Sequence, residues 1–275
     1  MSFSPSHLIL PCPHVHPDHS NERFKWFANL IIDLQPTHVI CLGDFADMPS
    51  LCSYDKGTKG FNNRRYQSDI DHVHEALNLI RGPLVARKKK LPKFFMLHGN
   101  HDHRIERAIN ADAVMLDGTI SLNDLHYKDY GWEVIPYSGS TPGVLELDGI
   151  SYAHFFTSGV MGRPIGGEHA AHTLLTKQFK SVTQAHIHTT DYCMRSDATK
   201  KHVQALVAGC YIDYYADWAG NANDLWWRGV VFKENVSNGT YDPSWIRLST
   251  IKKEYSCNGM PKHRVLMKNG LLGIQ

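Results

Sequence analysis

Two short segments of this chain place reactive side chains directly after apolar runs that are typical of buried strands. Asp44 follows one such run, and Asn100, His101 and Asp102 follow another. Carboxylate, amide and imidazole groups bind metals and transfer protons, and a strand end holds them in fixed positions. The two segments therefore indicate one polar centre built at strand ends.

The same arrangement recurs twice further along the chain. His154 follows the strand-like run at 150–153, and His186 and His188 follow the run at 181–184. Four strand ends that converge on His, Asn and Asp side chains are typical of a metal centre.

Such a donor set suits phosphate ester hydrolysis. Two divalent cations about 3.5–4 Å apart lower the pKa of a shared water and neutralise charge that develops on the phosphoryl oxygens. Asp44 is the expected bridging carboxylate, because Gly43 permits close backbone approach and the preceding strand fixes its position. The other expected ligands are neutral: Asn100, His154 and His186 for the second metal, and His188 and His14 for the first.

The first hundred residues alternate strand and helix. Apolar runs at 8–10, 39–42 and 94–97 predict buried strands, and apolar residues at helical spacing over 24–34 and 70–80 predict helices between them. This order predicts a sheet covered by helices. After a helical region at 105–116, Asp-Gly at 148–149 and Asn-Gly at 238–239 predict hairpins.

Composition and charge narrow the class of protein. Of 275 residues, 42% are hydrophobic and 20% charged, which is ordinary for a folded soluble chain. A net charge of +2 argues against a protein that holds duplex DNA by neutralising its backbone, although a nucleotide or single-stranded end stays open. No apolar run approaches the roughly 20 residues that span a bilayer, and no signal-peptide pattern is present, so we expect no membrane partner and a cytoplasmic location.

In their order, these motifs resemble the calcineurin-like metallophosphoesterases. That family's pattern is Asp-X-His, Gly-Asp, Gly-Asn-His-Asp/Glu, a lone His and Gly-His-X-His, and the likeness spans roughly residues 8 to 190. The segments 43–44, 99–102, 154 and 186–188 match directly, whereas Ala185 stands in place of Gly and Cys12 in place of Asp. Overall the chain looks most like phage- and prophage-encoded members, for which the cytoplasm would be that of the host.

The resemblance implies an α/β (α+β) fold: a four-layer αββα sandwich of two mixed sheets flanked by helices, with a dinuclear metal site at strand ends. It implies two divalent metal ions, Mn, Zn or Fe, and a metal-bridging hydroxide as nucleophile. It also implies that His101 protonates the leaving group or stabilises the phosphoryl oxygens. We thus expect Asp44 and His101 to be catalytic, Asn100 and His101 to contact substrate, the domain to cover residues 1–250, and a basic peripheral tail to cover 251–275.

Cys12 is the main departure from the family pattern, and three interpretations stay open. Its thiolate could bind the first metal, which would favour Zn²⁺ or Fe²⁺ over Mn²⁺ or Mg²⁺. Cys12 could instead be a bystander beside a weak first site. In the third interpretation the register slips, so that His14 and His16 form the pair.

Arg163 lies in a Gly-rich segment at 159–167, between two ligand motifs. A guanidinium there could bind a substrate phosphate through two parallel hydrogen bonds. An incidental Arg on a surface loop is the competing interpretation.

The expected function is that of a metal-dependent phosphoesterase acting on a phosphodiester, as a nuclease or nucleotide phosphodiesterase does, with a nucleotide or single-stranded nucleic acid as partner. The first alternative is a phosphomonoesterase acting on nucleotides or phosphoproteins. The second is a metal-poor binding scaffold, because the altered Asp-X-His motif is what loss of catalysis would look like.

Overall fold

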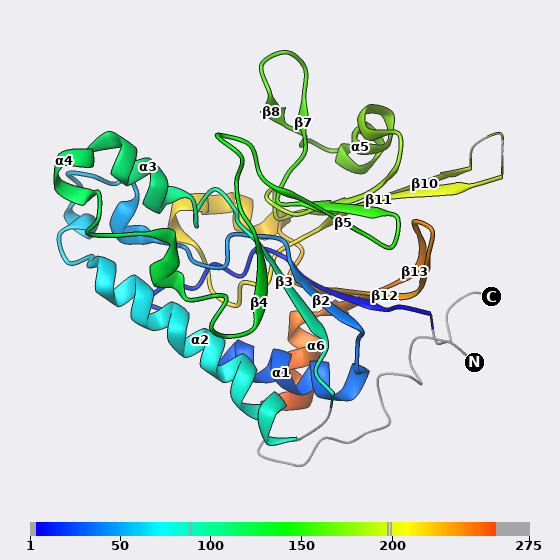
Figure 1. Ribbon diagram of the computed structural model, residues 1–275, viewed down its shortest axis with the longest axis horizontal. Helices are drawn as coiled ribbons and strands as arrows, with labels where there is room; N and C mark the ends of the chain where they lie inside the picture. Colours follow the sequence, from blue (N-terminus) through cyan, green and yellow to red (C-terminus); the bar gives the residue numbers. More distant parts are fainter. Residues whose placement is uncertain (1–3, 88–89, 197, 199, 257–275) are drawn as a thin grey trace.

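Two mixed β-sheets face each other and carry helices on their outer faces in the computed structural model, which describes residues 4–87, 90–196, 198 and 200–256 (Figure 1). The first sheet has the strand order β13 (Thr240–Arg247), β12 (Gly229–Ser237), β1 (His7–Leu10), β2 (His38–Cys41), β3 (Lys93–Leu97), β4 (Trp132–Ile135). The second has the order β10 (Thr190–Ser196), β11 (His202–Ala208), β9 (Ser181–Gln184), β6 (Ile150–Ala153), β5 (Val144–Leu147). This arrangement confirms the predicted αββα sandwich.

Parallel pairing in the middle of both sheets places several strand ends at one edge of the molecule. In the first sheet β1, β2, β3 and β4 are parallel, whereas β12 and β13 are antiparallel to their neighbours. In the second, β6, β9 and β11 are parallel, and β5 and β10 pair in antiparallel fashion. Parallel strands carry their C-terminal loops on the same edge, so residues far apart in sequence can meet there.

In β1, β2 and β3 every residue after the first is apolar, because both faces of these strands are covered. In β1, Leu8 and Leu10 belong to the core beneath the helices, and Ile9 belongs to the core between the two sheets. Successive side chains of a strand point to opposite faces, so a strand between two cores is apolar throughout. This explains why the short runs at 8–10, 39–42 and 94–97 predict strands correctly.

Helices close the outer faces. The first sheet is covered by α1 (Glu22–Leu34) and α2 (Tyr66–Ala86), with α6 (Leu248–Tyr255) packed beside α1, and the second sheet by α5 (Ala170–Gln178). After α1, Gln35 adopts a left-handed conformation with a φ of 49° and Pro36 follows, so the helix ends where predicted. The remaining helices are α3 (Arg104–Ala111), α4 (Ala113–Leu116), and the 3₁₀ turns η1 (Pro49–Leu51), η2 (Lys59–Phe61), η3 (Leu122–Leu125) and η4 (Asp217–Leu225).

The described part of the chain ends just after α6. The predicted domain boundary after residue 250 falls inside α6, whose Ile251 is buried. Residues 257–275 lie outside the described residues, so the peripheral tail stays a prediction. None of the described helices combines the length and apolar character that crossing a bilayer requires.

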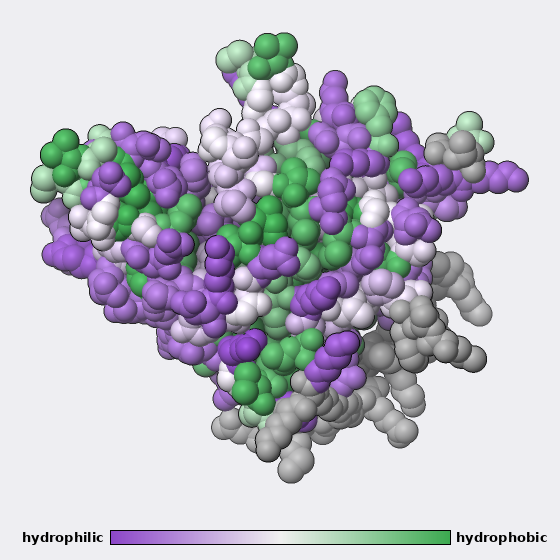
Figure 2. All heavy atoms as spheres, in the orientation of Figure 1, coloured by the Kyte–Doolittle hydropathy of each residue, from purple (hydrophilic) through white to green (hydrophobic). Residues whose placement is uncertain are grey.

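Exposed apolar side chains gather on two projections of the surface. Val160 and Met161 occupy the tip of the hairpin formed by β7 (Thr157–Ser158) and β8 (Arg163–Pro164), and Val114 and Met115 lie on α4. Figure 2 shows both as green patches, each standing out from a largely polar surround.

Candidate metal centre

The predicted ligands meet where five strands end. The loops after β1, β2 and β3 of the first sheet, and after β6 and β9 of the second, carry the seven predicted ligands and the predicted catalytic His101: Cys12, His14, Asp44, Asn100, His101, His154, His186 and His188. The structure brings all eight together, and their mutual distances decide what they can do.

Two glycines allow the loops after β2 and β3 to touch. A Cβ on Gly99 would lie 2.1 Å from Oδ1 of Asp44, and a Cβ on Gly43 would lie 2.7 Å from the backbone nitrogen of Gly99. Gly43 also has a φ of 92°, which side-chain-bearing residues rarely adopt. Glycine at both positions is therefore what seats Asp44 against the Asn100 loop.

Backbone strain is concentrated at the same place. Five of the predicted ligands have positive φ values, between 34° and 65°: Cys12, His14, Asp44, His186 and His188. Non-glycine residues in this region are strained, and such strain clusters at functional sites because surrounding structure must hold it.

One half of the centre is formed around His154. Its Nδ1–H donates to the carbonyl oxygen of Leu42 at 2.8 Å, so in the neutral ring Nε2 carries the lone pair. That Nε2 lies 2.9 Å from Oδ1 of Asn100 and 3.2 Å from Oδ2 of Asp44, with Nδ1 of His186 at 3.1 Å. A lone pair that faces two oxygen acceptors is repelled unless a cation lies among them, so this donor set fits a divalent metal.

The other half is formed around His14. Its Nδ1–H donates to Oδ1 of Asp47 at 2.7 Å, which leaves its Nε2 lone pair 3.2 Å from Nε2 of His188 and 3.5 Å from Oδ2 of Asp44. The same oxygen of Asp44 thus faces both halves. A carboxylate that bridges two metals requires this position.

Cys12 lies between the two halves. Its Sγ lies 4.0 Å from Nδ1 of His154 and accepts a hydrogen bond from the backbone N–H of His186 at 3.2 Å. Its Sγ lies within 4.8 Å of candidate ligand atoms of His14 and His188, which also lie within 4.8 Å of each other. The same holds for Cys12 with Asp44 and His154. Burial and the charge of Asp44 raise the pKa of the thiol well above its usual value, so a thiolate here requires a bound cation.

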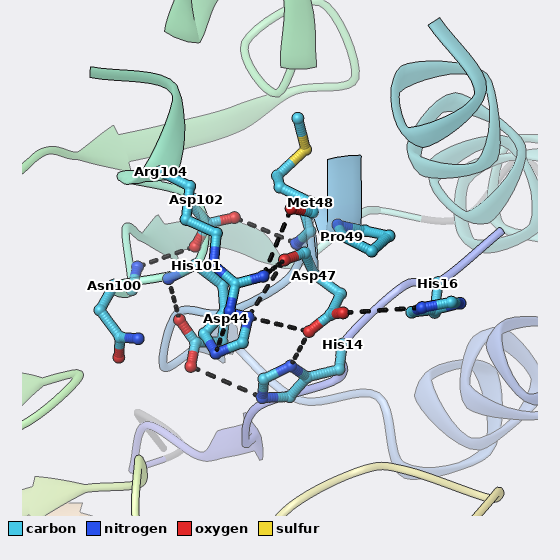
Figure 3. Close-up of polar contacts among 12 residues, drawn as sticks. His14, His16, Asp44, Asp47, Met48, Pro49, Asn100, His101, Asp102 and Arg104 are labelled. Atoms are coloured by element: carbon cyan, nitrogen blue, oxygen red, sulfur yellow. Dashed lines mark hydrogen bonds and ion pairs between the residues drawn. The ribbon is translucent and has the colours of Figure 1, made fainter. Parts of the chain in front are cut away.

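His16 lies outside these groups. Its Nε2 is 4.0 Å from Oδ2 of Asp47 and its Nδ1 is 3.8 Å from Oδ2 of Asp18. Figure 3 shows it on the far side of Asp47 from Asp44. Of the two candidates for the first site, the structure brings Cys12 rather than His16 to Asp44.

Asp47 is absent from the residues predicted from sequence, yet it is central. Its Oδ1 accepts from Nδ1–H of His14 at 2.7 Å and lies 2.8 Å from Nδ1 of His101 (Figure 3). A carboxylate behind an imidazole fixes its tautomer and orientation. Its position three residues after Asp44 was the feature of the sequence that could have indicated it. A tight loop at the end of a strand can bring a second side chain back to the same edge of the sheet.

His101 is held by both carboxylates. Its backbone N–H donates to Oδ1 of Asp44 at 2.8 Å, and its Nε2 lies 3.4 Å from Nη2 of Arg104. Burial lowers the pKa of His101, but the charges of Asp44 and Asp47 outweigh burial and raise the pKa above its usual value. Arg104, also absent from the predicted residues, donates from Nη1 to the carbonyl oxygen of Asp47 at 2.7 Å.

The remaining charges suit cation binding. Burial by itself would raise the pKa of Asp44, yet the neighbouring imidazoles, led by His154, lower it well below its usual range. Burial lowers the pKa of His188 well below its usual value and that of His186 to about 4. The centre therefore keeps Asp44 ionised and favours the neutral forms of His186 and His188, which are the protonation states that metal binding needs.

Asp102 belongs to the supporting structure. It is fully buried and accepts hydrogen bonds from the backbone N–H groups of Ala46 at 3.0 Å and Gly99 at 2.8 Å, and from the hydroxyl of Tyr127 at 2.7 Å. These bonds tie the loop after β2 to the loop after β3.

Arg163 is placed apart from the cluster. It lies on β8 in the projecting hairpin (Figure 1), where its side chain is exposed and forms no hydrogen bond or ion pair with any residue that the structure describes. The predicted contact with a substrate phosphate stays a prediction.

Comparisons with known proteins give distant structural similarity and no family assignment. No family model and no curated protein matches this chain. Its structure is similar to one described as a novel archaeal phosphodiesterase, with 11% identity, 88% of this chain and 99% of that chain covered, and a TM-score of 0.39. It is also similar to TT1561 of Thermus thermophilus, with 10% identity, 89% and 99% covered, and a TM-score of 0.42. Such distant likeness carries no argument about activity, and the likeness to phage-encoded members stays a prediction.

Proposed function

We propose that this protein is a metal-dependent phosphoesterase whose substrate is a phosphodiester. The observation that carries the proposal is the position of one oxygen, Oδ2 of Asp44, which lies 3.2 Å from Nε2 of His154 and 3.5 Å from Nε2 of His14. Two nitrogen-rich groups that share one carboxylate form a donor set for two cations.

Each cation would have its own set of side chains around the shared Asp44. Cys12, His14 and His188 would complete one site, and Asn100, His154 and His186 the other. When bound, two cations lower the pKa of a water and neutralise charge on the phosphoryl oxygens. A metal that accepts both imidazole and thiolate ligands, such as Zn or Fe, suits this set better than Mn.

His101 is the proposed general acid. Its Nδ1 is directed to Asp47, which leaves Nε2 as the atom for proton transfer; Nε2 now faces the donor Nη2 of Arg104 at 3.4 Å, so a transferable proton there requires that contact to open. The raised pKa of His101 favours its protonated form, and loss of the leaving alcohol needs a proton at this point. Asn100 and His101 would lie beside the phosphate because their backbone follows Gly99 into the centre.

A diester is favoured over a monoester by the charge of the centre. The guanidinium of Arg104, beside His101, is already engaged, because its Nη1 donates to the carbonyl oxygens of Asp47 and Met48. A singly charged diester needs less neutralisation than a doubly charged monoester. The phosphomonoesterase remains the alternative within the same chemistry.

The test starts with metal content. Purified protein supplemented separately with Mn²⁺, Zn²⁺ or Fe²⁺ should bind two equivalents per chain and hydrolyse bis(p-nitrophenyl) phosphate. Turnover of p-nitrophenyl phosphate alone would favour the monoesterase. Protein that binds no metal and turns over neither compound would leave the binding scaffold as the function.

A further inference from the structure

A cavity of about 760 Å³ borders the candidate metal centre on the side of Asn100. Phe155, in its wall, follows His154 and has its ring 4.8 Å from the ring of His186. The cavity wall therefore includes one proposed ligand and a direct neighbour of two others. The residues that matter for its chemistry are Asn100, His103, Glu106, Arg107, Tyr137 and Phe155.

A stacked pair of rings forms part of this wall. His103, in the loop after β3, and Tyr137, two residues after β4, lie with ring centroids 4.4 Å apart and planes 11° from parallel. The pair offers a flat surface of the kind on which another aromatic ring stacks.

The same two side chains carry unpaired polar atoms. The hydroxyl of Tyr137 and Nδ1 of His103 are buried and have no hydrogen-bond partner among the described residues. Buried polar groups are nearly always paired, so an exception calls for an explanation. Both residues line the cavity, but the two atoms themselves are closed to water in this structure, so a ligand in the cavity becomes their partner only when the rings turn toward it.

Charged side chains lie at the rim of the cavity. Arg107 is exposed, and its side chain forms no hydrogen bond or ion pair with the described part of the chain, whereas Glu106 beside it is half-buried. A free guanidinium next to a phosphoester site can bind a second phosphate or the edge of a base.

We propose that this cavity is a nucleobase subsite, which holds the base of a nucleotide whose phosphate ester lies at the metal centre. A heteroaromatic base supplies both things that the wall lacks: a π-face for the His103 and Tyr137 rings, and an edge of donors and acceptors for their unpaired atoms. The position of the phosphate rests on the proposed function, whereas binding of the base does not.

The test is a titration, by calorimetry or NMR, of metal-loaded and metal-free protein with the four common ribonucleosides, their 5′-monophosphates, ribose and ribose 5-phosphate. We expect at least one nucleoside to bind where ribose does not, with or without metal. Tyr137→Ala should weaken nucleoside binding about 5- to 100-fold through lost stacking. Tyr137→Phe, which removes only the hydroxyl, should weaken it about 2- to 10-fold.

Controls separate the subsite from general damage. Tyr54→Ala removes a tyrosine that is 87% exposed and outside the cavity wall, and should bind nucleosides as the wild type does. Melting temperature and metal content verify each variant, and Tyr137→Phe and His103→Ala serve if Tyr137→Ala does not fold. Nucleosides that bind no better than ribose, or that bind equally well to all cavity variants, would overturn the subsite.

The two proposals can fail separately. Nucleoside binding that depends on Tyr137, in a protein that hydrolyses no phosphoester, would support the subsite and overturn the proposed function. Diester hydrolysis with no nucleoside binding would overturn the subsite and leave the proposed function in place.

Discussion

The two ends of the sandwich both bury histidines and charged groups, but they satisfy them differently. At the end opposite the metal centre, Nε2 of His7 lies 2.9 Å from Oδ2 of Asp148, and Nδ1 of His7 lies 2.7 Å from the hydroxyl of Tyr152. Nζ of Lys233 donates to that hydroxyl at 3.4 Å and to Oγ1 of Thr183 at 2.5 Å. Donors and acceptors are matched along this chain of contacts.

At the metal centre they are not matched. Nε2 of His154 faces oxygen atoms of Asp44 and Asn100, all of them acceptors. Candidate ligand atoms of His7, His38 and Asp148 also lie within 4.8 Å of one another. Distances between ligand atoms by themselves therefore do not distinguish the two ends. A buried polar cluster therefore indicates a cation where acceptors converge, and a structural network where each acceptor has a donor.

The largest expected effect is at the shared carboxylate. Asp44→Asn should reduce diester hydrolysis to the uncatalysed background, a loss of about 10⁶-fold or more. It should also lower the metal content below two per chain, because two cations lose their common anion. Metal analysis and initial rates measure both quantities.

The matched control is the same substitution at the other end of the sandwich. Asp148→Asn should leave metal content and turnover as in the wild type, because Asp148 lies in the matched network. Unchanged metal stoichiometry in Asp44→Asn would contradict the bridging role.

A smaller effect is expected at the proposed acid. His101→Ala should keep both metals and lower turnover by about 10²- to 10⁴-fold, the range for loss of a general acid. Rates measured at saturating metal, with metal content in parallel, distinguish this from ligand loss. A variant that loses a metal would instead make His101 a ligand.

Cys12 provides a third comparison, between two models of the first site. Cys12→Ser should weaken metal binding there by at least about 10-fold, because a neutral hydroxyl replaces an anion. Cys12→Asp should keep two metals and shift the preferred ion toward Mn²⁺, because a hard oxygen replaces a soft sulfur. Competition with a metal-sensitive dye measures both affinities.

The opposing model predicts a different pair of results. If His14 and His16 form the first site, His16→Ala should remove metal and Cys12→Ser should have no effect. Either outcome would reject the thiolate.

The smallest effect concerns stability at the matched end. Burial lowers the pKa of His7 to about 4, against the hydrogen bond with Asp148, while the unfolded chain titrates near 6.5. The unfolded state therefore binds more protons between pH 6.5 and 4, so stability falls as the pH falls through this window, by about 3 kcal/mol for this group.

His7→Gln should lose that part of the pH dependence and keep wild-type turnover at pH 7. Urea unfolding between pH 7 and 4 measures the free energy of unfolding of both proteins. The difference between the two pH profiles isolates His7, because the other titrating groups contribute equally to both. Identical slopes would show that His7 does not titrate in this window, and altered turnover would show that the two ends are coupled.

The sequence by itself determined the elements that carry the centre. Runs at 8–10, 39–42 and 94–97 become β1, β2 and β3, since a strand between two cores must be apolar on both faces. Because the predicted ligands follow such runs directly, parallel pairing was enough to bring them to one edge. The same reasoning does not predict β4, because its partly exposed residues do not form a continuous apolar run.

Only the tertiary structure decided which neighbours each ligand has. The contact between the loops after β2 and β3 makes Asp47 the common partner of His14 and His101, places Cys12 rather than His16 beside Asp44, and leaves Arg163 on a separate hairpin. It also stacks His103 on Tyr137 across two loops. The periodicity of apolar residues indicates which face of an element is buried. These contacts depend instead on how loops from different strands pack, and no local sequence pattern determines the distance between two such loops.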